Sequence, residues 1–157
     1  MNSANMPNTN CTSGLNRYLR RENKKVVDTL RAAIKDRAVK EEDYPRVAIA
    51  CEYSNHQAYG HSLKCHSSIK APVNYVQPLL QALRVYGEPP KSEQDATIGK
   101  TIYIGSCAED SAANQVMEKT QISTGHYPRM KSLVFTKPVR ARNYQRRDFC
   151  DVCNAIF

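Results

Sequence analysis

Apolar residues recur at intervals of three and four from Leu15 to about Lys40, with charged residues between them. This period is typical of an amphipathic helix, so the segment is predicted to form one or two helices packed on a sheet. A second helix is predicted at Val76–Tyr86, with Pro78 in its first turn and Gly87 at its end. A third is predicted at Cys107–Lys119.

Several short runs of apolar and β-branched residues are typical of strands. Arg46–Tyr53 reads as a buried strand, and Ala58–Ser67 is predicted to return beside it after a turn. Further strands are predicted at Lys100–Ile104 and at Ser132–Thr136, running toward Val139. Strands that alternate with helices predict an α/β sandwich, with a mixed central sheet and helices on both faces.

The chain of 157 residues has the size of one compact domain. Residues 1–14 are polar and rich in Asn, and they are predicted to form a disordered tail before a single domain at 15–157. The tail lacks the apolar core of a secretory signal, and no apolar stretch approaches the length of a membrane span. We expect a protein without a membrane partner, either cytoplasmic or delivered into a target cell.

The formal net charge of +8 favours a polyanionic partner, and nucleic acid before a membrane surface. Basic side chains gather toward the end of the chain, where they would form a track for phosphates or simply a solvated basic edge. The candidates for nucleic-acid contacts are Lys137, Arg140, Arg142, Arg146 and Arg147.

Two short motifs carry the candidate chemistry. Cys107-Ala-Glu109 follows one predicted strand, and Cys150-Asp-Val-Cys153 follows a later one. Three thiolates with one open position make a catalytic zinc site, whereas a structural zinc site normally closes with four protein ligands. The alternative for the cysteines is burial in a core beside an incidental pair, and for Glu109 a carboxylate favoured by a helix dipole.

Placement supports the metal site. Cysteines in the first turn of a helix are favoured as thiolates by the unpaired amides and the macrodipole. Cys150 and Cys153 are three residues apart and would face the same way on a helix. Glu109 would reach a water at the metal and move its proton. Because three thiolates give a negative centre, we expect Arg142, Arg146 or Arg147 to hydrogen-bond a ligand sulfur.

Together, Gly105-Ser-Cys-Ala-Glu109 and Cys150-x-x-Cys153, each opening a helix after a strand, resemble the signature of the cytidine-deaminase superfamily. The nearest branch is the YwqJ-like deaminases of bacterial polymorphic toxins. The match covers about residues 101–157. One position departs from it, since many relatives have Pro where this chain has Phe149.

The resemblance implies a three-layer sandwich of the cytidine-deaminase type and hydrolytic deamination of a base with loss of ammonia. It implies Cys107, Cys150 and Cys153 as ligands of Zn²⁺ and Glu109 as the general acid and base. The backbone around Ser106 and Ala108 would line the base pocket.

The substrate and setting follow from the same resemblance together with the charge. The expected reaction is conversion of cytosine to uracil in single-stranded DNA or RNA by a toxin or effector domain, with an immunity protein as a possible partner. Asn55, after the first strand, and His126, in a later loop, are candidate substrate contacts. The alternatives are a free nucleoside or nucleotide deaminase, and a non-catalytic zinc module that binds nucleic acid or protein.

Overall fold

The computed structural model describes residues 7–10, 12–38, 40, 45–62, 74–88 and 104–157. The elements in these ranges are, in chain order, helix α1 (Ser13–Lys35), strands β1 (Val47–Tyr53) and β2 (His56–His61), helices α2 (Gln77–Arg84) and α4 (Ala108–Thr124), 3-10 helix η4 (Met130–Ser132), strands β3 (Val134–Phe135) and β4 (Val139–Arg140), and helix α5 (Asp151–Ile156).

Helix α1 is one continuous helix, which settles the prediction of one helix or two between Leu15 and Lys40. Thr12 caps its start, and the Thr12 Oγ1 accepts a hydrogen bond from the Leu15 amide at 3.4 Å. The apolar stripe is buried, with Leu15 and Leu19 almost fully excluded from solvent. Helix α1 is thus an amphipathic helix that packs on a sheet, as its period predicts.

Strand β1 lies at the centre of the sheet and pairs with every other strand. It pairs antiparallel with β2 along its length, and on its other side with β3 and then β4. The fold is thus mixed α/β, as predicted. The described strands form an antiparallel sheet, however, and not the mixed sheet predicted from the alternation of elements. Of the strand predicted at 100–104, residues 100–103 lie outside the described residues and Ile104 lies in a turn.

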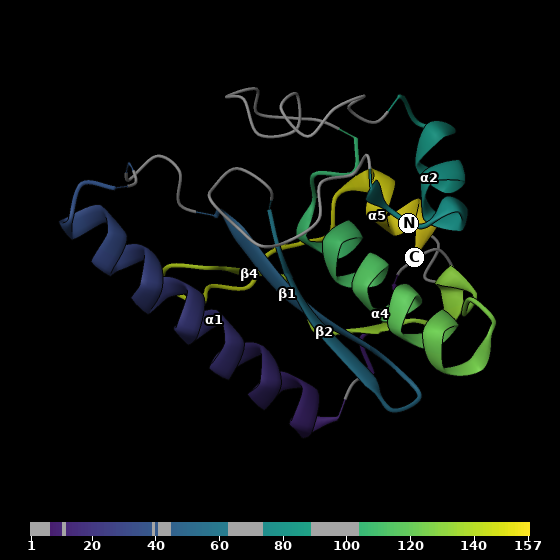
Figure 1. The fold of residues 1–157 in the computed structure, drawn as a ribbon, viewed down its shortest axis with the longest axis horizontal. Coiled ribbons are helices and arrows are strands. Elements are labelled where there is room, and N and C mark those ends of the chain that lie inside the picture. The colour runs from purple at the N-terminus through teal and green to yellow at the C-terminus, as the bar shows by residue number, and fades with distance from the viewer. Residues whose placement is uncertain (1–6, 11, 39, 41–44, 63–73, 89–103) are drawn as a thin grey trace.

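The two faces of the sheet have separate cores. Ala48 and Ala50 of β1 pack in one cluster with residues of α1, whereas Ile49 and Cys51 pack in another with residues of α2, α4 and α5. This alternation follows from the two-residue period of a strand. Figure 1 shows α1 on one side of the β1–β2 hairpin and α4 on the other.

Helix α4 lies against β2 with almost no space between the backbones. A Cβ built on Gly60 of β2 would lie 2.3 Å from the Ala108 carbonyl oxygen and 2.6 Å from the Ala112 nitrogen. A residue without a side chain is therefore required at position 60. Helix α4 runs beyond the Lys119 predicted from sequence and ends at Gly125, whose φ of 80° suits glycine.

The strand predicted at Ser132–Thr136 and running toward Val139 is found as two short strands, β3 and β4, while Ser132 belongs to η4. The Thr136 hydroxyl accepts a hydrogen bond from the Ala50 amide at 3.0 Å, and the Thr136 amide donates to the Ala50 carbonyl at 3.0 Å. Lys137 and Pro138 then separate β3 from β4. Lys137 is exposed.

Part of the segment predicted as a disordered tail contacts the sheet. The Phe135 amide donates to the Asn8 carbonyl at 2.8 Å, and Asn8 forms a parallel bridge with Val134. Helix α1 begins at Ser13, inside the predicted tail. Within the described ranges, no helix combines the length and apolar character needed to cross a bilayer.

Candidate metal centre

Three cysteine sulfurs converge where α4 and α5 begin. Cys107 is the N-cap of α4, and Cys150 is the N-cap of α5. Together with Cys153 their sulfur atoms all lie within 4.8 Å of one another, and Cys107 Sγ is 3.7 Å from Cys150 Sγ. The prediction that these three cysteines come together is confirmed.

The sulfur spacing and chemistry fit a zinc ion. Two thiolates at Zn–S distances of about 2.3 Å and a tetrahedral angle have sulfurs about 3.8 Å apart. The 3.7 Å between Cys107 and Cys150 is close to that value, and it is far from the ~2.05 Å of a disulfide. Soft sulfur donors also select zinc over magnesium or calcium. The three cysteines could therefore hold a metal ion of the zinc type.

The turn before α4 places Cys107. Gly105 has a φ of 90°, which a residue with a side chain adopts only with strain, and its carbonyl accepts a hydrogen bond from the Tyr75 hydroxyl at 3.0 Å. Val76, which follows Tyr75, is held by Asn114 of α4, because the Asn114 Oδ1 accepts a hydrogen bond from the Val76 amide at 2.8 Å. The segment before α2 thus supports the turn that presents Cys107.

The first turn of α5 places the other two sulfurs. Cys150 Sγ accepts a hydrogen bond from the Cys153 amide at 3.4 Å, in the manner of a capping side chain. Phe157 is buried behind Cys153, and its ring centroid lies 5.1 Å from that of Phe135 on β3. Packing of this aromatic pair holds α5 to the sheet.

The three cysteines shift one another's pKa in opposite directions. Hydrogen bonds from the thiols of Cys107 and Cys153, together with backbone amides, lower the pKa of Cys150 to about 2. The hydrogen bond to Cys150 raises the pKa of Cys107, and hydrogen bonds to both neighbours raise the pKa of Cys153. Binding a metal cation would require all three thiols to be deprotonated, so it would release their protons.

Glu109 lies beside the sulfurs in the first turn of α4. It is only 4% exposed, and its Oε2 accepts a hydrogen bond from Cys153 Sγ at 3.6 Å. Burial, with a contribution from the charge on Cys150, raises the pKa of Glu109 to about 7. A carboxyl group that can hold or release a proton near neutral pH is thus placed next to the cluster.

Two further buried residues at the cluster were missed by sequence reasoning. Asp110 is 1% exposed, its pKa is raised well above the ordinary value mainly by burial, and among the described residues its Oδ1 has no hydrogen-bond partner. Tyr75 is the other. In the sequence, Asp110 is an acidic residue in the first turn of a helix, where the helix dipole commonly favours one. Nothing in the sequence distinguishes Tyr75 from other tyrosines of the core.

Only part of the predicted substrate site lies beside the cluster. Ser106 and Ala108 flank Cys107 directly. Asn55 lies in the β1–β2 turn. The next residue, His56, has its Nε2 2.9 Å from the Oγ of Ser123, which lies near the C-terminal end of α4. His126 follows that same end, about 25 Å along the 17-residue helix from the cysteines. Asn55 and His126 are therefore not brought to the metal centre.

Arg142 and Arg146, two of the three arginines predicted to hydrogen-bond a ligand sulfur, do not lie beside the cysteines. Arg142 lines a surface depression with Asn23 of α1, and Arg146 lines a different one with Asn16 of α1. Both depressions lie on the sheet face opposite the cysteines. Arg140 and Arg147 are exposed, and the Arg147 amide donates to the Pro138 carbonyl at 2.8 Å.

We compared the chain with protein-family models, with curated proteins and with solved structures, and found no match in any of the three.

Proposed function

We propose that the protein is a zinc-dependent hydrolytic deaminase of a nucleobase, converting cytosine to uracil in single-stranded nucleic acid. The observation that carries the proposal is the buried carboxyl of Glu109 against Cys153, beside three sulfurs that leave a tetrahedral metal one open position. A purely structural site has no need of a protonatable group there.

The three-layer sandwich of the cytidine-deaminase type is part of the same proposal. Two features of the fold support it. Helices lie on both faces of the sheet, α1 on one and α4 on the other. The two cysteine motifs also open α4 and α5, which belong to the core on a single face. Such a placement lets two segments distant in sequence share one ion.

Each residue of the centre has a defined task. Cys107, Cys150 and Cys153 hold the zinc, which when bound supplies a Lewis acid that makes water a stronger acid. Glu109 takes a proton from the attacking water and delivers it to the base. Water adds at the amine-bearing carbon and ammonia leaves, so that an exocyclic amine is replaced by a carbonyl oxygen. The backbone at Ser106 and Ala108 faces the ring of the base.

The net charge of +8 supports a polymeric substrate, because free nucleosides have no phosphates to neutralise. The base must be unpaired or flipped, since its reacting carbon is inaccessible inside a duplex. Delivery into a target cell and an immunity protein that blocks the centre belong to this proposal as its biological setting.

The experiment is sequencing of single-stranded DNA and RNA pools after incubation with the zinc-loaded protein and with Glu109→Ala, with bound zinc quantified in both. We expect base conversions with the unsubstituted protein only, and about one zinc per chain in both. Glu118→Gln is the matched control, because it removes a carboxylate from the same helix away from the cysteines. Equal conversion by both proteins, or none by either, would contradict the proposal.

A non-catalytic zinc module is the second candidate, and one contact favours it. The Glu109 Oε2 is near enough to Cys153 Sγ that a small shift would make the carboxylate a fourth ligand and close the site. In that case Glu109→Ala would lower zinc affinity strongly. Under the proposed function zinc affinity changes little while turnover is lost. A third arm, with free cytidine and deoxycytidine as substrates, identifies a nucleoside deaminase.

A further inference from the structure

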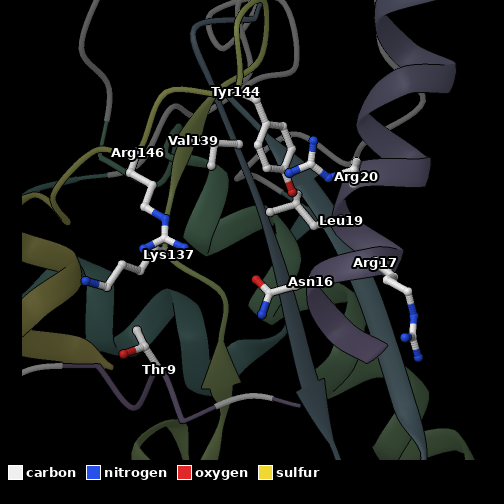
Figure 2. Close-up of a pocket in the computed structure, with 9 residues that line it drawn as sticks. All are labelled: Thr9, Asn16, Arg17, Leu19, Arg20, Lys137, Val139, Tyr144 and Arg146. Atoms are coloured by element: carbon white, nitrogen blue, oxygen red, sulfur yellow. The ribbon is translucent and has the colours of Figure 1, made fainter. Parts of the chain in front are cut away.

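A cavity of about 480 Å³ lies between the first half of α1 and the segment around β4, and four of the residues that line it are basic. Arg17 and Arg20 come from α1, and Lys137 and Arg146 from the chain around β4. Figure 2 shows the two pairs on opposite sides of the cavity, with Tyr144 between them. Among the described residues that line it, none is acidic.

The charges of this basic cavity are not consumed by ion pairs within the described ranges. Helix α1 has its ion pairs elsewhere, at Arg21–Glu22, Lys24–Asp28 and Lys25–Glu22. Instead of pairing with an acid, the Arg20 guanidinium lies over the Tyr144 ring, 4.2 Å from its centroid. Four cations that line one concave surface repel one another, so an anion bound there would stabilise them.

The wall that carries Arg146 has a fixed conformation. Tyr144 has a φ of 61°, which is uncommon for a residue with a side chain. Its amide donates to the Arg140 carbonyl at 2.9 Å, and the Arg147 amide donates to the Pro138 carbonyl at 2.8 Å. Val139 and Arg146 form an antiparallel bridge. The turn is thus held closed by backbone hydrogen bonds, which fix the position of the Arg146 backbone beside the cavity.

We infer that this basic cavity binds phosphate groups of a single-stranded nucleic acid at a point remote from the metal centre. Phosphate is the anion that several arginines and a lysine recognise together, through charge and forked hydrogen bonds. The choice of a nucleic acid as the source of the phosphates rests on the proposed function. The choice of phosphate rests on the cavity alone.

The position of the cavity gives the contact a particular role. Val139 and Leu19 belong to the core on the α1 face of the sheet, whereas Cys153 belongs to the core on the α4 face. A nucleic-acid strand bound at both places would have to pass from one face of the sheet to the other. The basic cavity therefore holds the strand outside its reacting base, and the contact requires a long oligonucleotide.

The test is fluorescence anisotropy with a labelled oligodeoxythymidine on the full chain, over a range of salt concentrations. Lys137→Gln/Arg146→Gln removes two of the cations. Arg84→Gln/Arg129→Gln is the matched control, because it removes the same charge from exposed positions on other elements. Circular dichroism and urea unfolding establish that both variants are folded.

We expect the cavity variant to lower the slope of log affinity against log salt by about 1.4, because each of the two phosphates that its cations would neutralise accounts for roughly 0.7. The same relation gives an affinity about 25-fold weaker at 0.1 M salt. The control pair should retain most of the slope. Equal reductions in the two variants would mean that only net charge matters, and would overturn the inference.

Two further arms identify the ligand and separate this inference from the proposed function. Inorganic phosphate that displaces the probe as well as unlabelled oligonucleotide does would make the cavity a small-anion site and overturn the nucleic-acid assignment. Binding is measured on Glu109→Ala, which does not turn over. Cavity-dependent binding without deamination by the unsubstituted protein would leave the inference standing and the proposed function wrong. Deamination by the unsubstituted protein, with unchanged binding in the cavity variant, would leave the proposed function standing and overturn the inference.

Discussion

The hydroxyl of Tyr59 on β2 donates a hydrogen bond to Oδ1 of Asn23 on α1 at 3.0 Å. The side-chain Nδ2 of the same Asn23 donates a hydrogen bond to the Ala141 carbonyl at 2.8 Å, and Asn23 is 5% exposed. One buried side chain therefore connects α1, the hairpin and the segment after β4. Helix α1 and the segment after β4 also line the basic cavity.

Asn23→Ala should lower the free energy of unfolding by about 2–3 kcal/mol, because two hydrogen bonds across the core are removed at about 1 kcal/mol each and a small void is added. Urea unfolding measures the change. Lys24→Ala, at the exposed neighbouring position, should change stability by less than about 0.5 kcal/mol. Similar values for the two variants would contradict the role assigned to Asn23.

Gly60→Ala should destabilise the protein by at least about 1–3 kcal/mol, since the new methyl group would overlap the backbone of α4 at Ala108. Gly14→Ala is the matched control. In helix α1 a Cβ at position 14 meets only the Thr12 hydroxyl at 3.5 Å, so this change should stabilise by about 0.5–1 kcal/mol. Thermal or urea unfolding of the two variants should give effects of opposite sign.

The chain should bind one zinc through its three clustered cysteines. Replacing any of them with Ser should weaken binding by more than about 100-fold, since even the partners of metal ligands contribute 10–100-fold. Competition with a chromophoric chelator gives the affinity. Cys51→Ala should bind zinc normally, because Cys51 is buried in β1 and lies outside the cluster. Loss of zinc in that variant would show that the cluster is not the site.

Tyr75→Phe should weaken zinc binding by up to about tenfold and lower stability by about 1 kcal/mol, because the hydroxyl that holds the Gly105 carbonyl is removed. Tyr127→Phe, at an exposed position, should change neither quantity. An unchanged zinc affinity in Tyr75→Phe, with stability lowered, would mean that Tyr75 supports the core and not the metal centre.

His61 should make stability fall as the solution becomes acidic. Its ring is buried and Nδ1 donates to the Ser62 carbonyl at 2.9 Å. Burial lowers the pKa of His61 below its ordinary value of 6.5, so on acidification the unfolded chain takes up a proton before the folded protein does. The stabilisation is full above about pH 6.5 and is lost as the pH falls toward the folded pKa.

The measurement is urea unfolding at several pH values for the unsubstituted protein and His61→Gln. Other groups also titrate in this range, so the difference between the two proteins isolates His61. We expect that difference to shrink between pH 6.5 and 5. Two curves that stay parallel would show that His61 does not titrate on unfolding.

The helices and the pairing of Cys150 with Cys153 could be predicted from the sequence because each depends on local spacing. Leu15, Leu19 and Leu30 mark one face of α1 by their period, and Cys150 with Cys153 marks one turn of α5. Convergence with Cys107 followed from the chemistry of a three-thiolate site. These features need no knowledge of how distant segments pack.

What could not be predicted depends on where the chain turns. Thr136 interrupts a strand by bonding Ala50 with its side chain, and nothing in the local pattern indicates that bond. The interruption and the turn at Tyr144 direct Arg146 toward α1, away from the sulfurs. Asn55 was assigned to the site by position after a strand, but the hairpin carries it to the opposite end of α4.

Helix α5 has six residues, yet it provides Cys153 and follows directly from Cys150, so it carries two of the three sulfurs. A helix of that length has little stability of its own in water. It is attached to the rest of the protein through the buried Ile156 and Phe157, and a metal ion held by the three sulfurs would add a second attachment. Under the proposed function, zinc supply would therefore also govern the lifetime of the protein, because a chain without zinc would release this segment first and expose it to proteases.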